Sequence, residues 1–351
     1  MKEVCKRILP VLLLAGFLIA ALVIGPQGKT QQTAKPGSPL TADAFLLDTF
    51  CSLTLYDGSE AALGSALALL EQFDELWNQS KETSDIYRIN HRSSDVVEIH
   101  PQTAALLRWA KAYEEQAGGD FDVSIAPLSA LWDTQHRTKV PSEAEIEEAR
   151  SKLAFDAWSV EGETFRAAKQ TLQLDVGAFA KGYIADRLKE DLEANGVSSA
   201  VINLGGNVLC IGEEAPGKPF RIGLKKPERG SESYLKVLEI NGLSVVTAGI
   251  YERYFEQDGV IYHHILDPKT GWPVQNTLAA VTVLGPESAA CDALSTTVFI
   301  KGEEAGTAFL SDWNRTVKAQ AEKQEDPYYA YFIHRDGSLS WTAGAEQFFR
   351  E

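Results

Sequence analysis

Residues 262–274, YHHILDPKTGWPV, combine two adjacent histidines with an aspartate and a Gly- and Pro-containing turn. In an extended segment, His263 and His264 point to opposite faces. Asp267 and Pro268 then end the strand in a turn. An imidazole presented just before a tight loop is typical of a binding site. A solvated turn with a structural histidine fits the same residues, and this segment alone leaves both readings open.

Asp292 and Thr296 lie four positions apart in AACDALSTTVFIKG, so they stack on one face of an otherwise apolar helix. A carboxylate on a buried face needs a cation or hydrogen-bond donors. A carboxylate beside a hydroxyl or a backbone oxygen suits Mg²⁺ or Ca²⁺, whereas zinc prefers other ligands. Asp292 could equally cap a neighbouring loop, and the spacing does not decide between the two roles.

Three further clusters could contact a ligand. Residues 175–187, DVGAFAKGYIADR, leave a strand and enter a helix through Gly177, which can aim backbone groups and Asp175 at a ligand. Residues 202–207, INLGGN, end a strand in a diglycine that lets the backbone approach a phosphate or ring, although a plain tight turn explains a diglycine more often. Residues 118–122, GGDFD, place two carboxylates around an aromatic, or simply end one helix and cap the next.

The elements that must position these clusters mix strands and helices without a regular βαβ period. Apolar periodicity and turn residues predict strands at 50–56, 171–175, 199–204, 219–224, 234–239, 243–247, 260–266 and 278–284. Helices are predicted at about 60–78, from Pro101 to Gly118, from a capping box at Ser142, at about 178–194 and at about 287–301. A C-terminal hairpin turns at Asp336-Gly337. We expect an α+β fold with mixed, largely antiparallel sheets and flanking helices.

The N-terminus predicts membrane targeting. Lys2, Lys6 and Arg7 precede an uncharged apolar run over 8–24, so residues 1–25 form a signal peptide or signal anchor. We favour an uncleaved anchor, which places the catalytic domain outside the cell membrane. Residues 26–42 are rich in Gly, Pro, Gln and Thr and predict a flexible tether, followed by one domain over 43–351.

Charge and cysteine spacing exclude several classes of function. The formal net charge of −16 argues against nucleic acid or an anionic membrane surface as the main partner. Cys51, Cys210 and Cys291 lie far apart with no CxxC spacing, so neither a zinc cluster nor a disulfide framework is indicated. We expect buried structural thiols.

Seven segments follow one another in the order typical of the ApbE family, the FAD:protein FMN transferases. They are LLDTFCSLTLY, SDIYRIN, GGDFDVSIAPL, LDVGAFAKGYIADRL, INLGGN, TAGIYERYF with YHHILDPKTGWPV, and ACDALSTTVFIKG. The chain resembles this family over roughly residues 46–302. An ApbE-like flavin transferase fold is therefore implied.

The resemblance also implies roles for individual residues. FAD contacts are implied for the positions Leu47, Asp120, Phe121, Asp122, Asp175, Lys181, Asn203, Gly205, Gly206 and His264. A divalent-metal site is implied for the backbone carbonyl of Ala178 with Asp292 and Thr296, and catalysis for His264 and Asp292. Trp77 is close in sequence to where an aromatic flavin-stacking partner is expected, but the motifs assign none.

The implied reaction transfers FMN from its substrate FAD to a Ser or Thr hydroxyl of an acceptor protein and releases AMP. Mg²⁺ is the expected cofactor, with Ca²⁺ as an alternative, and His264 is the candidate general base. The acceptor would be a membrane redox subunit or an exported flavoprotein carrying a flavinylation motif. Two alternatives use the same residues: an FAD pyrophosphatase that gives FMN and AMP, and a flavin-binding module outside the membrane without turnover.

Overall fold

The computed structural model describes residues 38–227, 233–321 and 327–350. The chain divides into Met1–Ser38 and Pro39–Glu351, and the fold below is that of the second unit. The predicted N-terminal anchor lies outside the described residues, so it stays a prediction. Strand β1 begins at Leu40, inside the range predicted as a tether. Among the described residues, no helix has the length and apolarity required to cross a bilayer.

One eight-stranded sheet organises this unit, in the order β1-β2-β6-β7-β10-β13-β14-β15 among the described residues. Every neighbouring pair in it is antiparallel. Its strands are β1 (Leu40–Leu46), β2 (Thr49–Leu55), β6 (Ala200–Leu204), β7 (Asn207–Ile211), β10 (Ser244–Gly249), β13 (Leu278–Gly285), β14 (Tyr329–His334) and β15 (Leu339–Trp341). The predicted α+β class with largely antiparallel sheet is confirmed.

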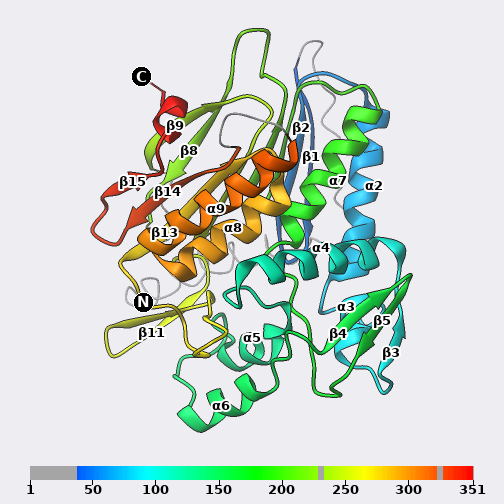
Figure 1. The fold of residues 1–351 in the computed structure, drawn as a ribbon. Helices are drawn as coiled ribbons and strands as arrows, with labels where there is room; N and C mark the ends of the chain where they lie inside the picture. Colours follow the sequence, from blue (N-terminus) through cyan, green and yellow to red (C-terminus); the bar gives the residue numbers. More distant parts are fainter. Residues whose placement is uncertain (1–37, 228–232, 322–326, 351) are drawn as a thin grey trace, which may run out of the picture. The chain divides into compact units, whose positions relative to one another are not determined.

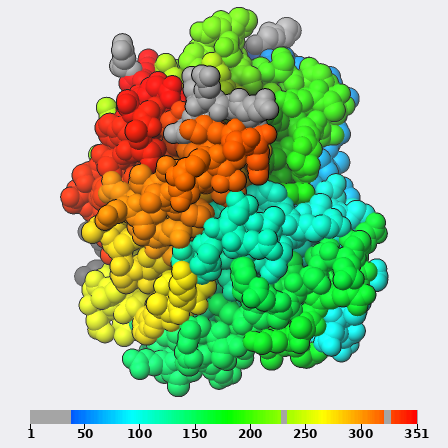
Figure 2. Space-filling model, viewed as in Figure 1, coloured from blue at the N-terminus to red at the C-terminus, as the bar shows by residue number. Residues whose placement is uncertain are grey.

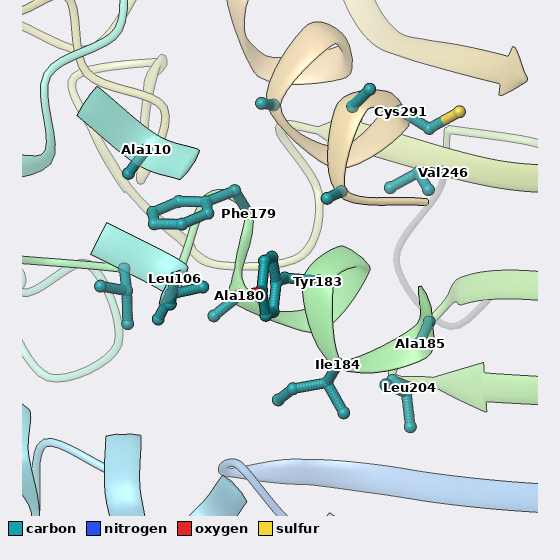
Figure 3. Packing of buried hydrophobic residues seen from close by; sticks show 14 of the residues in the cluster. Leu106, Ala110, Phe179, Ala180, Tyr183, Ile184, Ala185, Leu204, Val246 and Cys291 are labelled. Carbon is teal, nitrogen blue, oxygen red and sulfur yellow. The ribbon is translucent and has the colours of Figure 1, made fainter. Parts of the chain in front are cut away.

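Helices cover one face of this sheet (Figures 1 and 2). They are α2 (Glu60–Trp77), α7 (Ala180–Ala194), α8 (Ser288–Lys301) and α9 (Glu303–Ala321), with α4 (Pro101–Ala117) crossing below them. Helix α7 packs between α2 and α8, and α8 contacts β10 and β13. Figure 3 shows Phe179, at the start of α7, beside Leu106 and Ala110 of α4 in the buried core. The main core therefore lies directly behind the loop that enters α7.

The hairpin of β8 (Phe220–Lys225) and β9 (Tyr234–Ile240) covers part of the opposite face of the sheet. Phe220 and Leu238 of this hairpin pack against Val245 and Tyr331 of the sheet in a second core. Cys51, Cys210 and Cys291 are buried and free, which confirms the prediction of structural thiols.

Smaller elements complete the unit beside α4. Helix α3 (Asp85–Asn90) and the sheet β3-β5-β4 lie on one side, with strands β3 (Val96–Glu98), β4 (Trp158–Glu161) and β5 (Thr164–Ala167). Helices α5 (Ala126–Trp132) and α6 (Glu143–Ser151) pack with the hairpin of β11 (Tyr254–Gln257) and β12 (Val260–His263) around Trp132. Two 3₁₀ turns are η1 (Val123–Ile125) and η2 (Ala345–Phe348).

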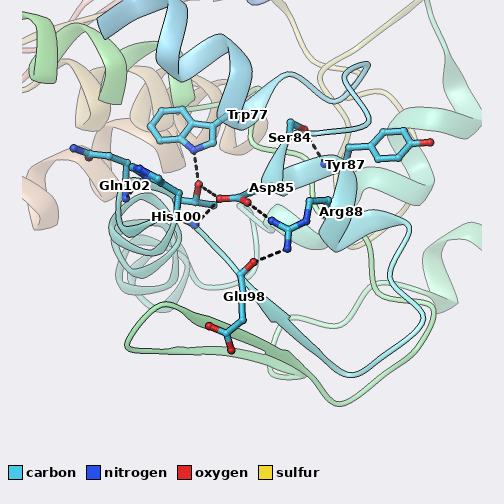
Figure 4. A network of polar contacts seen from close by, with 9 residues as sticks. Trp77, Ser84, Asp85, Tyr87, Arg88, Glu98, His100 and Gln102 are labelled. Carbon is cyan, nitrogen blue, oxygen red and sulfur yellow. Dashed lines mark hydrogen bonds and ion pairs between the residues drawn. The ribbon is translucent and has the colours of Figure 1, made fainter.

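The carboxylate of Asp85 ties α3 to α4 (Figure 4). It accepts from Thr103 Oγ1 at 2.6 Å, from the His100 N–H at 2.7 Å and from Arg88 at 2.9 Å. The indole N–H of Trp77 donates to Thr103 at 3.0 Å. A buried carboxylate is stabilised when several donors satisfy it, as here.

The helix boundaries predicted from local capping residues are confirmed for α4 and α6. Helix α4 begins at Pro101 and ends at Gly118, whose φ of 66° is left-handed, and the capping box between Ser142 and Glu145 is present. The hairpin turn at Asp336-Gly337 joins β14 to β15 as predicted. The predicted strand at 171–175 is wrong, because its backbone pairs with no strand: Asn90 bonds both the N–H and the C=O of Leu174, and the N–H of Asp175 donates to the carbonyl of Val123.

Candidate active site

Asp292 is the buried carboxylate at the centre of the candidate site. It lies in α8 with 6% of its surface exposed, and its Oδ2 accepts the backbone N–H of Gly182 from α7 at 2.9 Å. A Cβ on residue 182 would lie 2.2 Å from the carbonyl oxygen of Ser288, so only glycine lets the two helices approach this closely. The bond therefore depends on the sequence of both helices.

The carbonyl of Ala178 lies in the turn that leads into α7. Asp175 Oδ1 accepts the N–H of Gly177 at 2.9 Å, and the N–H groups of Phe179 and Ala180 donate back to Val176 at 3.2 and 2.9 Å. The N–H that would normally reach the Ala178 carbonyl is that of Gly182, which instead donates to Asp292. Within the described residues no backbone N–H donates to the Ala178 carbonyl.

This arrangement fits a hard divalent cation. No described hydrogen bond reaches Asp292 Oδ1, and Thr296 lies one turn further along α8, half-buried. The described residues hold no cluster of three or more His, Cys, Asp or Glu side chains suited to a metal. A cation here would therefore be held by a carboxylate, a carbonyl and a hydroxyl, a donor set that suits Mg²⁺ or Ca²⁺.

The raised pKa of Asp292 also fits a bound cation. Burial raises the pKa of Asp292 above its ordinary value, while Lys181 and the Gly182 N–H oppose that rise. A carboxylate destabilised by burial gains most from a bound cation, because the cation replaces the lost hydration. The Lys181 ammonium donates to the carbonyl of Gly177 at 3.1 Å and so stays beside the same turn.

Asn207 is a site residue that the sequence motifs did not single out. It is buried at 2% exposure, and its Oδ1 accepts from Ser288 Oγ at 2.8 Å. Its Nδ2 is close enough to lower the pKa of Asp292, yet it has no partner in hydrogen-bond geometry. Its position directly after the diglycine in INLGGN is the sequence feature that could have identified Asn207 as a candidate. Asn207 is thus a neighbour of the carboxylate with one unused donor.

The diglycine forms the two-residue turn between β6 and β7. Gly205 and Gly206 have φ values of 63° and 94°, and the side chain of Asn203 accepts the N–H of Gly206 at 2.9 Å. A Cβ on Gly205 would lie 2.3 Å from Thr49 Oγ1, whereas one on Gly206 would meet open space. Turn geometry and packing explain Gly205, and Gly206 leaves its backbone accessible.

Leu47 lies in the turn between β1 and β2, on the side of the sheet end where the diglycine also lies. Its N–H donates to Asp74 Oδ1 at 2.7 Å, and its φ is 55°. Lys81 pairs with Asp74 at 2.5 Å. Trp77 is buried at 2% exposure and bonded to Thr103, so its ring belongs to the core.

The two adjacent histidines have different environments, as their alternation predicts. His263 is fully buried, bonds the Val274 carbonyl through Nε2 at 2.8 Å and meets the Phe299 ring edge-on. His264 is exposed, and its Nδ1 lies 3.3 Å from the Arg253 carbonyl. Desolvation by the surrounding protein lowers the pKa of His264 against the opposing bond to the Arg253 carbonyl, and the charges of Arg253 and Lys181 lower it further. His263 is structural, and His264 presents a neutral imidazole.

Comparison with known proteins identifies the family. The model of the ApbE family matches residues 47–320. This chain belongs to the ApbE family. It is 38% identical over 276 residues to an FAD:protein FMN transferase of Klebsiella pneumoniae, covering 76% of this chain and 84% of that protein. It is 30% identical to the FAD:protein FMN transferase of Treponema pallidum, covering 76% and 80%.

Solved ApbE structures share the fold. The ApbE protein of Thermotoga maritima superposes with a TM-score of 0.77 at 26% identity, covering 90% of this chain and 100% of that one. The flavinyl transferase ApbE of Pseudomonas stutzeri gives a TM-score of 0.75 at 27% identity, covering 89% and 97%. The resemblance drawn from the seven motifs is confirmed.

The side chains of the GGDFD segment of this ApbE chain mainly contact other residues of the same chain. Asp120 pairs with Lys269 at 2.5 Å and with Lys301. Burial would raise the pKa of Asp120, but the two ammonium groups hold it below its ordinary value. The ring of Phe121 is 4% exposed and packs in the core. Asp122 caps η1 through the Ser124 N–H and hydroxyl at 2.7 and 2.6 Å.

The same segment is bonded to the Asp175 turn. Glu114 of α4 accepts the N–H of Val123 at 2.7 Å, and the carbonyl of Val123 accepts the N–H of Asp175 at 2.8 Å. Most of the predicted positions therefore fall into two groups. One group lies around the turn into α7 and comprises Asp175, Ala178, Lys181, Asp292, Thr296 and His264; the other lies at the end of the sheet and comprises Leu47, Asn203, Gly205 and Gly206. Asp120, Phe121 and Asp122 belong to neither and are linked to the first through Val123.

Proposed function

We propose that this ApbE chain uses Mg²⁺ to transfer FMN from FAD to a Ser or Thr hydroxyl of an acceptor protein. A phosphoester would form between that oxygen and the FMN phosphorus, and the bond to AMP would break. The coarser activity, flavin transfer from FAD to a protein, is that of an FAD:protein FMN transferase, which the family and the curated relatives show. The metal, the hydroxyl and the residue roles belong to the proposal.

One observation carries the metal assignment: the N–H of Gly182 bonds Asp292 and leaves the Ala178 carbonyl without a backbone donor. Asp292, Thr296 and that carbonyl would hold the ion. When bound, Mg²⁺ neutralises charge on pyrophosphate oxygens. Lys181 and Asn207 lower the pKa of Asp292 and so partly compensate the burial of its carboxylate.

His264 supports the proton transfer. Its imidazole is exposed and its surroundings lower its pKa, so the ring is available to accept the proton of an acceptor hydroxyl at neutral pH. Its contact with the Arg253 carbonyl orients the ring. The accessible backbone of Gly206 and the half-buried Leu47 are proposed flavin contacts at the edge of the same site.

We also propose where the reaction occurs. Lys2, Lys6 and Arg7 before the apolar run favour an N-terminal anchor with the catalytic domain outside the cell membrane. Such an enzyme would meet membrane redox subunits or exported flavoproteins as acceptors. Protease accessibility of the domain in intact cells, compared with lysed cells, tests this orientation.

The deciding experiment is mass spectrometry of a flavinylation-motif acceptor after incubation with the full chain, FAD and Mg²⁺. The acceptor should gain FMN less water, with equimolar AMP, and Asp292→Ala should abolish both. Asp312→Ala, which removes an exposed carboxylate paired with Arg315, is the matched control. Free FMN with an unmodified acceptor would indicate hydrolysis instead, and bound FAD without AMP would indicate a binding module.

A further inference from the structure

Two exposed phenylalanines mark the hairpin beside the candidate site. Phe45 of β1 and Phe50 of β2 are 72% and 60% exposed, the highest values among the large apolar side chains that the structure describes. They lie directly opposite each other in the antiparallel register. Directly opposed residues share one face of a sheet, so the two rings form one apolar pair. Single exposed apolar residues are common and need no explanation, whereas adjoining exposed apolar side chains can mark an interaction site.

The pair has no role in the core. The alternate residues of β2, Cys51 and Leu53, are buried in the main core with the helices. Phe45 and Phe50 therefore face away from the helices. A partner that covered the two rings would remove their apolar surface from water, which is favourable. This gain is available to an interface and is unused in the described fold.

The backbone of the pair is linked to candidate flavin contacts. The carbonyl of Phe50 accepts the N–H of Gly205 at 3.0 Å, so it is bonded directly to the diglycine turn. The hairpin turn between the two phenylalanines contains Leu47, whose N–H is bonded to Asp74. Two of the proposed flavin contacts are thus joined to the pair through the backbone.

The reaction requires a protein at this edge. An acceptor must bring a hydroxyl to the FAD phosphate, and a specific interface covers about 800 Å² per partner, which extends well past the reacting group. Aromatic side chains that become buried at such an interface carry much of its binding energy. An acceptor held at the site therefore also contacts the surface around the reacting group.

The charge beside the pair defines the partner further. Asp43 is exposed and lies two residues before Phe45 on the same face of β1, and Asp48 is exposed in the hairpin turn. A complementary surface would present an apolar side chain flanked by Lys or Arg. We propose that Phe45 and Phe50, with Asp43 and Asp48, form the docking surface for the acceptor protein. This inference rests on the proposed function, because that function locates the site.

The test separates acceptor binding from flavin binding. Wild-type full chain in detergent is first shown to flavinylate a soluble acceptor protein, and failure at this step counts against the proposed function alone. Phe45→Ser and Phe50→Ser should then each raise KM for the acceptor about tenfold and leave KM for FAD unchanged. Tyr234→Ser, which removes a 53% exposed aromatic from β9, should leave both unchanged.

Charge reversal gives a second, independent readout. Asp43→Lys should raise KM for the acceptor further at low salt than at high salt, because the exposed charge is screened by salt. An unchanged acceptor KM in all three variants overturns the proposal. A parallel rise in KM for FAD would assign the pair to the flavin site, and a change in oligomeric state on sedimentation would assign it to a second copy of the chain. A rise in acceptor KM that deletion of residues 1–37 reproduces in the wild type would assign it to the N-terminal segment. Each of these three results also overturns it.

Discussion

The N–H of Gly182 donates to Oδ2 of Asp292 at 2.9 Å and joins α7 to α8 beside the Ala178 turn. This bond takes the place of the ordinary helical bond from residue 182 to residue 178. It therefore does two things at once, because it fixes the carboxylate and leaves a carbonyl free next to it. Helix packing and the candidate metal site have the same geometric cause.

Gly182→Ala should disrupt both. A Cβ at this position would lie 2.2 Å from the Ser288 carbonyl, and overpacking of this kind costs about 1–3 kcal/mol of unfolding free energy. We expect a lower urea midpoint, loss of FMN transfer and weaker Mn²⁺ binding measured by electron paramagnetic resonance. Gly64→Ala in α2 is the control, since its Cβ would meet nothing within 4 Å. Wild-type metal binding in the Gly182 variant would contradict the proposed site.

His264→Ala distinguishes proton transfer from phosphate binding. If His264 is the general base, kcat should fall about 10²–10⁴-fold with KM for FAD nearly unchanged. Because the surroundings lower the pKa of His264, the wild-type kcat should fall only at a pH below the ordinary histidine range, and the variant should lack that limb. Quenched-flow measurement of AMP release across pH checks this. A raised KM with normal kcat would assign His264 to the pyrophosphate, and His136→Ala, an exposed histidine paired with Asp133, is the control.

The sequence predicted those elements whose signals are local. Helix α4 starts at a proline and ends at a left-handed glycine, and α6 begins with a capping box, so neighbouring residues suffice to place them. The strand at 171–175 failed because Asn90, 84 residues earlier, satisfies its backbone. Strand β7 and helix α9 were not predicted, since β7 follows the β6 strand after only two glycines and α9 continues from α8 after a single glycine.

The candidate site divides in the same way. Motif order singled out Asp292, Ala178 and His264 as candidates, because each lies in a segment that resembles the family. Motif order cannot predict which residues of two helices far apart in sequence contact each other. The bond from Gly182 to Asp292 spans 110 positions, and the buried amide of Asn207 depends on Ser288 across 81 positions. Patterns of neighbouring residues do not predict pairs separated by so many positions.

Glu114 should make stability fall with rising pH. Its side chain is fully buried, Oε2 has no hydrogen-bond partner, and the Lys111 ammonium is 3.7 Å away. Burial, with a smaller contribution from Asp122, outweighs the opposing Val123 N–H and Lys111 and raises the pKa of Glu114 to about 8. Because its pKa is higher in the folded than in the unfolded protein, Glu114 contributes stability that is fully present at a pH below its unfolded pKa of about 4.3. This contribution is lost as the pH rises through its folded pKa.

Glu114→Gln isolates that contribution. Between pH 5 and 8 the wild type should lose up to about 1.4 kcal/mol per pH unit relative to the variant. Urea unfolding of both proteins at several pH values measures the difference, and shifts from other groups cancel. Glu115→Gln changes an exposed neighbour on the same helix and should follow the wild type. Parallel pH dependence of Glu114→Gln and the wild type would show that the buried carboxyl does not titrate in this range.

Asp120 should hold the loop after His264 in place. Its carboxylate is 12% exposed and accepts from Lys269 in that loop and from Lys301 at the end of α8. Lys269 is 56% exposed, so its pairing alone contributes little, and the more buried Lys301 should dominate. Because the folded pKa of Asp120 is lowered, its contribution is present above the unfolded pKa of about 3.9 and is lost as pH falls below it.

Asp120→Asn should therefore destabilise the fold by about 1–3 kcal/mol at pH 7 and raise KM for FAD, since two ammonium groups lose their partner. The loss should shrink at acid pH, where the wild-type carboxylate is also neutralised. Asp312→Asn breaks an exposed pair with Arg315 and should change stability by less than about 0.5 kcal/mol. Hydrogen exchange of residues 265–274 locates the effect: faster exchange there in Asp120→Asn alone supports the role, and unchanged exchange with raised KM would instead mean that Asp120 contacts FAD directly.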